Sequence, residues 1–223
     1  MPLQQLPNWI QFGAFLLALN AGMINVLSLI TVLHQSISHM TGNVSVFAIA
    51  WSHQDYRMMI YVLLVVIFFV LGSFYSGYIL GDGNVQLGRR YGIPLTLVSL
   101  FILLCWCFIP YFPRYALLWA AAAMGMQNAM VSHYRGTIIR TTHLSGVLTD
   151  IGLAFGYLVR GLKVDPRRLL LHFLILSGFF VGGVIATIIY KFWGTHAFLI
   201  PAILTASLSL TYWALYLRQH PYH

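Results

Sequence analysis

The sequence predicts an all-α transmembrane protein with about six spanning helices and two short, broken or re-entrant helices, built as two internal repeats. Three observations predict this fold: an oily composition, the lengths of the apolar segments, and motifs that recur in order. Of the 223 residues, 60% are hydrophobic and 7% are charged, and the mean hydropathy is +0.81. A soluble domain of this size cannot bury so much apolar side chain, so we expect the lipid bilayer to surround it.

Six apolar segments are long enough to cross the hydrocarbon core, which takes roughly 20 residues. We expect spans at approximately Trp9–Leu33, Met58–Leu80, Tyr91–Ile109, Tyr115–Val131, Leu169–Tyr190 and Ala197–Leu217. Two shorter stretches, Val44–Trp51 and Val147–Leu158, each follow a polar cluster directly. Irregular backbone at membrane depth is tolerated only inside protein or beside a cavity, so these two stretches are predicted to be re-entrant. Full crossing by both is the alternative.

The basic residues favour the re-entrant topology. Full crossing would divide them seven to five between the two sides of the membrane. Re-entry leaves only Arg57, Arg114 and Lys191 opposite the termini, so nine of the 12 Lys and Arg gather on the side of the termini. This stronger bias predicts that both termini are cytoplasmic. Three spans per half make the repeats inverted, which we favour; four would make them parallel.

Three short motifs recur in the same order along the chain. "GMIN" at 22–25 matches "GMQN" at 125–128, "HMTG" at 39–42 matches "HLSG" at 143–146, and "FVLG" at 69–72 matches "FVGG" at 180–183. No linker or shift in composition separates the two halves. We therefore expect one integral membrane domain over residues 1–223, with repeat one at about 9–110 and repeat two at about 114–218.

The same residues carry a family resemblance. "AGMINVLSL" with "HMTGNV", then "GMQNA" with "RTTHLSGVLTDIG", resembles the YoaK-type family of small bacterial membrane proteins of uncharacterised function. Ser145 replaces the Thr that is usual in the second cluster, and Asn25 lies in surroundings where such proteins often carry an acidic residue. The resemblance implies a multi-pass protein of the bacterial inner membrane, without an established substrate.

The two polar clusters supply a predicted site. Thr41, Gly42 and Asn43 lie at the expected start of a short helix, where a hydroxyl can cap free backbone N–H groups. Ser145 and Gly146 lie at the equivalent place in the second half. If these two N-termini meet, the positive ends of their dipoles would attract a polar or anionic group. Simple caps and small-residue packing contacts are the alternative.

Three further kinds of residue belong to this expectation. Asn25 and Asn128 fall within spans, where a buried amide must be hydrogen-bonded, and we expect them to hold the broken helices in place. Asp150 is the one acidic residue in an apolar stretch, which makes it a candidate for proton or cation coupling. An ion pair with Arg140 is its alternative role. The expected substrate-binding set is Asn25, His39, Thr41, Gly42, Asn43, Asn128, Arg140, Thr141, Thr142, His143, Ser145 and Gly146, with Asp150 as the coupling residue.

These residues favour a secondary transporter of a small polar or anionic solute, with its site between the repeats. A channel or passive facilitator with two re-entrant loops and a non-transporting membrane scaffold are the alternatives. No motif for an enzyme is present, and we expect no cofactor and no metal site. The net charge of +8 does not indicate nucleic acid, because the basic residues punctuate apolar segments. Small-residue faces would suit a homodimer.

Overall fold

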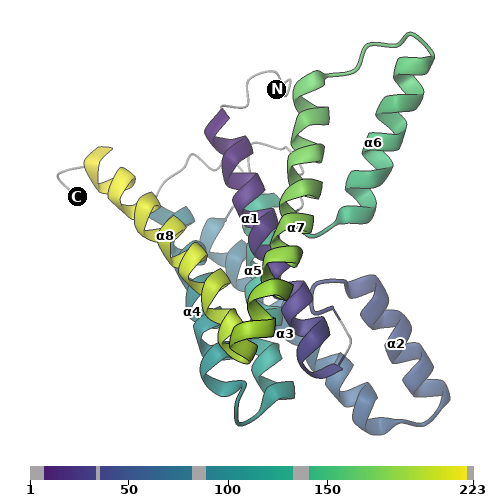
Figure 1. The fold of residues 1–223 in the computed structure, drawn as a ribbon, viewed down its shortest axis with the longest axis vertical. Coiled ribbons are helices and arrows are strands. Elements are labelled where there is room, and N and C mark those ends of the chain that lie inside the picture. Colours follow the sequence, from purple (N-terminus) through teal and green to yellow (C-terminus); the bar gives the residue numbers. More distant parts are fainter. Residues whose placement is uncertain (1–7, 34–35, 82–88, 133–140, 220–223) are drawn as a thin grey trace.

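The computed structural model describes residues 8–33, 36–81, 89–132 and 141–219, and helices dominate all four stretches (Figure 1). The expectation of an all-α protein is confirmed, since these residues contain no strand. The elements are α1 (Asn8–Ser28), η2 (Leu29–Leu33), α2 (Met40–Ser52), α3 (Tyr56–Leu80), α4 (Arg89–Phe108), α5 (Pro113–Ser132), α6 (Leu144–Val159), α7 (Pro166–Trp193), η3 (Gly194–Phe198) and α8 (Leu199–Gln219). Among them, η2 is a π-helical turn that extends α1, and η3 is a 3₁₀ turn between α7 and α8.

The helices have the length and composition of a membrane protein. Four helical stretches are long and apolar enough to cross a bilayer: Trp9–Thr31, Tyr56–Leu80, Arg90–Phe108 and Pro166–Arg218. The last of these spans 53 residues and contains both α7 and α8. The two short helices begin three or four residues before the apolar stretches of the sequence, because the polar clusters themselves form their first turns.

Two close helix crossings build the core. Helix α1 packs along α7, and α3 packs along α5. At the first crossing, a Cβ added to Gly22 would lie 2.0 Å from the carbonyl oxygen of Phe179. At the second, a Cβ added to Gly125 would lie 1.9 Å from the carbonyl oxygen of Phe69. Glycine is therefore required at both crossings, because only its missing side chain allows the backbones to come so close.

The partner helices contribute glycines of their own. A Cβ on Gly182 would lie 2.1 Å from the carbonyl oxygen of Leu19, and one on Gly72 would lie 2.0 Å from that of Ala122. Gly72 and Gly182 thus make the same kind of close backbone contact. The predicted alignment of "FVLG" with "FVGG" pairs Gly72 with Gly183 instead, and a Cβ on Gly183 would lie 2.9 Å from the side chain of Val26.

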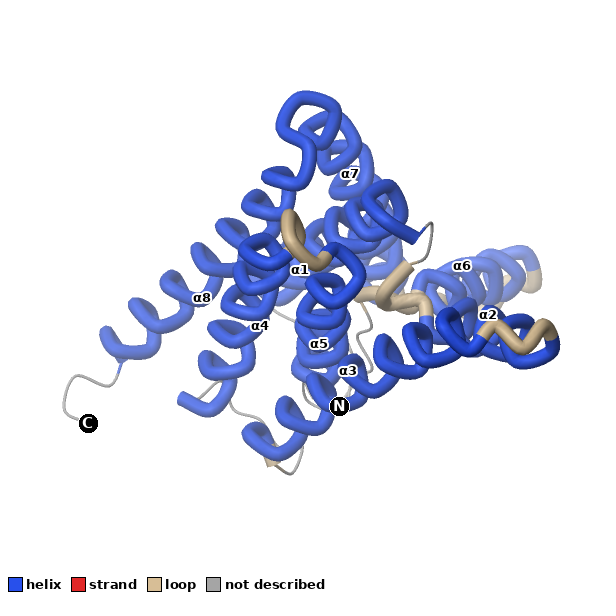
Figure 2. The backbone as a smooth tube through the Cα atoms, turned by 90° about the horizontal axis from the view of Figure 1, so that it is seen from below, coloured by secondary structure: helices blue, strands red, loops and turns tan. Residues whose placement is uncertain are grey.

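Helices α2 and α6 stand apart from this core (Figures 1 and 2). Each packs mainly on the next long helix, α2 on α3 and α6 on α7. Helix α2 buries only Asn43 and Ala50, and α6 buries only Val147 and Ile151. Such sparsely packed helices are the elements that can move most easily relative to a core.

The two ends of the bundle are unequal. Helix α4 packs closely on α5, but α8, its counterpart by position in the second half, makes few contacts with α1. An apolar cavity of about 280 Å³ lies among α1, the end of α8, the start of α4 and the end of α5, with Gly13, Leu17, Leu208 and Tyr212 in its wall. The opposite end is filled by fully buried side chains such as Ile102, which is 0% exposed.

Candidate functional site

The segment before α2 is fixed to α1 by one amide. Asn25, which is 2% exposed, donates from Nδ2 to Ser38 Oγ at 2.6 Å and to the carbonyl of Ala21 at 2.9 Å. Its Oδ1 accepts from the backbone N–H of Ser38 at 3.2 Å and from the hydroxyl of Ser36. Asn43 also holds this segment, because it donates to the carbonyl of Ser36 at 3.1 Å. Both amides are thus engaged within the protein, which is the scaffold role expected of Asn25.

An equivalent bond exists in the second half. Asn128 donates from Nδ2 to Thr142 Oγ1, as Asn25 donates to Ser38. Ser36 and Ser38 are not among the residues expected from the sequence, although Ser38 directly precedes "HMTG" as Thr142 directly precedes "HLSG". A hydroxyl pairing with each repeated Asn was the feature that could have identified Ser38.

A second group of hydrogen bonds holds the segment that enters α6. Gln127, fully buried on α5, accepts from Asn20 Nδ2 at 2.8 Å and donates to Thr141 Oγ1 at 3.3 Å and to the carbonyl of Leu17 at 2.9 Å. Asn20 was missed by the sequence analysis, because nothing in its motif distinguishes it from a core position. These bonds join α1, α5 and the segment that enters α6.

The N-termini of α2 and α6 have the same geometry. The N-cap residues are His39 (φ −89°, ψ 73°) and His143 (φ −89°, ψ 63°), and neither caps its helix through the side chain. The prediction that Thr41 and Ser145 are the capping residues is therefore wrong. Each helix begins one residue earlier, so these hydroxyls lie within the first turn, where they are exposed.

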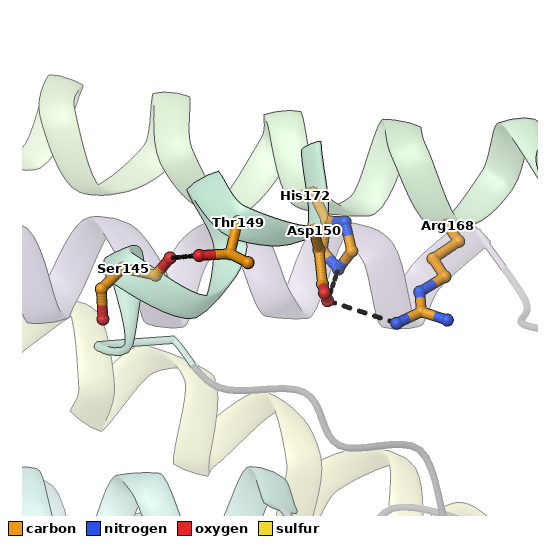
Figure 3. Close-up of polar contacts among 5 residues, drawn as sticks. All are labelled: Ser145, Thr149, Asp150, Arg168 and His172. Atoms are coloured by element: carbon orange, nitrogen blue, oxygen red, sulfur yellow. Dashed lines mark hydrogen bonds and ion pairs between the residues drawn. The ribbon is translucent and has the colours of Figure 1, made fainter. Parts of the chain in front are cut away.

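The first turns of both helices carry one more matched pair of bonds. The hydroxyl of Ser45 donates to the carbonyl of Thr41 at 3.0 Å, and that of Thr149 donates to the carbonyl of Ser145 at 2.9 Å (Figure 3). The two glycines differ. A Cβ on Gly42 would lie 2.5 Å from the ring of His39, whereas one on Gly146 would meet no atom within 4 Å.

Asp150 does not lie beside these exposed hydroxyls. Figure 3 shows it on the side of α6 that faces α7, where its Oδ2 is 3.2 Å from Arg168 Nη2 and 3.4 Å from His172 Nε2. The expected partner, Arg140, lies outside the described residues. Arg168 is not among the residues expected at the site, so its pairing with Asp150 adds a residue to that set. His172 was missed because it falls inside an apolar segment.

The site therefore separates into two parts. One part is the pair of N-termini of α2 and α6, where the side chains of His39, Thr41, His143 and Ser145 are exposed. The buried Asn25 and Thr141 hydrogen-bond in the segments that enter these two helices. The other is the ion cluster of Asp150, between α6 and α7. Across the described stretches, no group of three His, Cys, Asp or Glu is placed to hold a metal ion.

Comparison with known proteins gives a family without an activity. Neither the search of curated proteins nor that of solved structures finds a match. The model of one family, described as a protein of unknown function (DUF1275), matches residues 13–211. This match covers most of the chain and agrees with the uncharacterised status that the resemblance implied, while the YoaK-type name stays an expectation. The chain thus belongs to the DUF1275 family of proteins of unknown function.

Proposed function

We propose that the protein is a secondary transporter of a small polar or anionic solute, with its site where the starts of α2 and α6 approach each other. The observation that carries the proposal is the pair of uncapped helix N-termini, one from each half. In both, the N-cap side chain makes no hydrogen bond to the first turn, and each N-terminus carries the positive end of a helix dipole. Figure 1 draws α2 and α6 running in opposite directions away from this region. Such N-termini attract anions and hydrogen-bond acceptors.

The proposal includes a topology of six spans, α1, α3, α4, α5, α7 and α8, with α2 and α6 re-entrant. Helix α5 is less apolar than the others, yet its residues from Ala116 to Ala123 and from Met124 to Asn128 are almost all buried by neighbouring helices. Lipid contact therefore does not determine its composition. A re-entrant arrangement also supplies what membrane depth demands, because the non-helical segments before α2 and α6 are bound to protein through Asn25 and Asn128.

The proposal further includes two inverted repeats that exchange helices. Support comes from the matched crossings of α1 on α7 and of α5 on α3, and from the matched bonds of Asn25 and Asn128. Because each crossing joins one half to the other, the two helices of a crossing would move together in a rocking motion. The open contact of α8 with α1, against the closed contact of α4 with α5, is the inequality expected of one state in an alternating-access cycle. The termini side is proposed to be cytoplasmic, in a bacterial inner membrane.

A charge placed at a helix start tests the solute site. Proteoliposomes would be screened with small inorganic and carboxylate anions and with neutral polyols, using uptake as the readout. Ser145→Asp and Thr41→Asp each place a carboxylate at a proposed N-terminus, and each should abolish uptake because the new carboxylate occupies the anion position. Ser52→Asp is the control, since Ser52 is exposed at the far end of α2. Equal uptake by all four proteins would contradict the site.

Coupling has its own test. Asp150→Asn should abolish uptake driven by an ion gradient while expression and folding remain, because the neutral amide cannot cycle through a charged state. Asp55→Asn is the matched control, since this Asp only accepts from the backbone N–H of Met58 in the first half. Unchanged coupled uptake by Asp150→Asn would show that the coupling role is wrong. Flux that follows the solute gradient alone would identify a channel, and no flux of any solute would favour a scaffold.

A further inference from the structure

We infer that the coupling ion is a proton and that the pair formed by Asp150 and His172 takes it up where α6 packs on α7. The coupling role rests on the proposed function, whereas the proton site rests on the geometry of Asp150, Arg168 and His172. Asp150 extends from the short helix, and Arg168 and His172 extend from the same face of the long one, one turn apart.

The surroundings of the carboxylate favour a proton over a metal cation. Its Oδ2 faces two nitrogen groups, Arg168 Nη2 at 3.2 Å and His172 Nε2 at 3.4 Å. Hard cations such as Na⁺ or Mg²⁺ bind within a shell of oxygen ligands. The positive charge of Arg168 disfavours the binding of such a cation here. The other carboxylate nearby, Asp165, accepts the backbone N–H of Arg167 at 3.0 Å and so starts α7. A carboxylate beside an imidazole is instead a common arrangement for binding a proton.

Water can reach this pair. A cavity of about 250 Å³ lies between α6 and α7, and its charged and titratable lining consists of Asp150, Tyr157, Lys163, Asp165, Arg168 and His172. Helix α6 packs mainly on α7, so these are the groups that face the pair from α6, α7 and the loop between them. The side chain of Asp150 is 38% exposed and that of His172 is 11% exposed. Both groups thus line the cavity, and the carboxylate is the more exposed of the two.

The proton step changes the charge of the cluster by one. Before uptake, Asp150 is ionised, Arg168 is charged and His172 is neutral, so the net charge of the three is zero. One proton from water adds to the pair, either at the imidazole or at the carboxylate, and the net charge becomes plus one. Because α6 is held to α7 by little buried surface, this change in the electrostatic contact of Asp150 with His172 and Arg168 lets α6 shift.

The first half lacks this cluster. At the repeat offsets, Val46 takes the place of Asp150, Met58 that of Arg168, and Val62 that of His172. Val62 is 1% exposed, so the equivalent position between α2 and α3 is apolar. Only α6 should therefore respond to pH.

Distance measurements between spin labels test this without any solute. In a Cys107→Ser background, Gly152→Cys on α6 and Phe180→Cys on α7 carry the labels, in lipid nanodiscs. Both positions are exposed, and Gly152 lies on the opposite side of α6 from Asp150. The matched control pair is Ala48→Cys on α2 and Val70→Cys on α3, which are exposed and lie at the same repeat offsets.

Between about pH 5 and about pH 8, where histidine titrates, the α6–α7 distance distribution should shift and the α2–α3 distribution should not. Asp150→Asn should remove the shift, and Asp150→Glu should keep it. If Asp150→Asn does not fold, His172→Gln serves, and it should remove the shift within this range. An unchanged α6–α7 distribution, or a shift that survives His172→Gln, overturns the inference. A shift in a protein that transports nothing supports the proton site and contradicts the proposed function instead.

Discussion

The two short helices share one frame and differ in their chemistry. Each has a His as its N-cap residue, and the side chain of that His does not cap the helix. Each is followed by a long helix whose N-cap is an Asp: Asp55 accepts from Met58 N at 3.1 Å, and Asp165 accepts from Arg167 N at 3.0 Å. The frame is thus present twice. The comparison teaches that the features common to both halves are those that place backbone, whereas the ion cluster of Asp150, Arg168 and His172 occurs in one half.

The core near these helices shows the same division. At the segment that enters α6, Asn20 from α1, Gln127 from α5 and Thr141 form a buried hydrogen-bonded set. At the repeat offset, the equivalent positions are occupied by Ala123, Ile24 and Ile37, all at most 2% exposed. The entry segment of α6 is therefore held by an additional set of amides and a hydroxyl, whereas aliphatic side chains pack at the equivalent positions near α2.

The largest effect should come from the glycine crossings, where the two halves are most alike. Gly22→Ala and Gly125→Ala each force a methyl group against a backbone carbonyl, at a cost of about 1–3 kcal/mol or more. Both variants should lose monodisperse protein and melting temperature to a similar extent, as measured by size-exclusion after heating. Gly77→Ala is the control, because its Cβ would meet nothing within 4 Å. A large effect at one crossing alone would break the comparison.

A smaller effect should distinguish the two halves. Gln127→Ile removes the partners of Asn20 and Thr141, and each polar group left unpaired costs about 1–3 kcal/mol. The combined change Asn20→Ala, Gln127→Ile and Thr141→Ile copies the first half and should recover most of that loss. Thermal unfolding of the single and triple variants measures both. A triple variant less stable than Gln127→Ile would show that the apolar set does not fit this place.

The smallest effect concerns the matched N-caps. Asp55→Ala and Asp165→Ala each remove one carboxylate from a helix start, which costs about 1 kcal/mol. The two losses should agree within a few tenths of a kcal/mol in the same thermal assay, since the caps are equivalent. Asp82→Ala, a change in an acidic residue that lies between α3 and α4 in the sequence, controls for the loss of charge. A marked difference between Asp55→Ala and Asp165→Ala would limit the likeness of the halves to their N-terminal segments.

Much of this fold could be predicted from the sequence, because hydropathy determines where long helices lie in a membrane. The segment Met58–Leu80 agrees with α3 to within two residues. Helix starts were harder: α2 and α6 include polar residues that apolar patterning cannot place. The partners of Asp150 were not predictable at all, since Arg168 and His172 are near it only because α6 folds back on α7. Long-range pairing depends on packing, which no local pattern records.

The contact between α1 and α7 has a consequence for biogenesis. Gly22 on α1 meets its partner backbone on α7, so the two are separated by most of the chain. At about 5–20 residues per second, α1 is inserted on the order of ten seconds before α7 is synthesised. During that interval the glycine face of α1 is open to other helices in the membrane. Correct assembly of this protein thus requires that α1 stays unpaired until α7 has been synthesised.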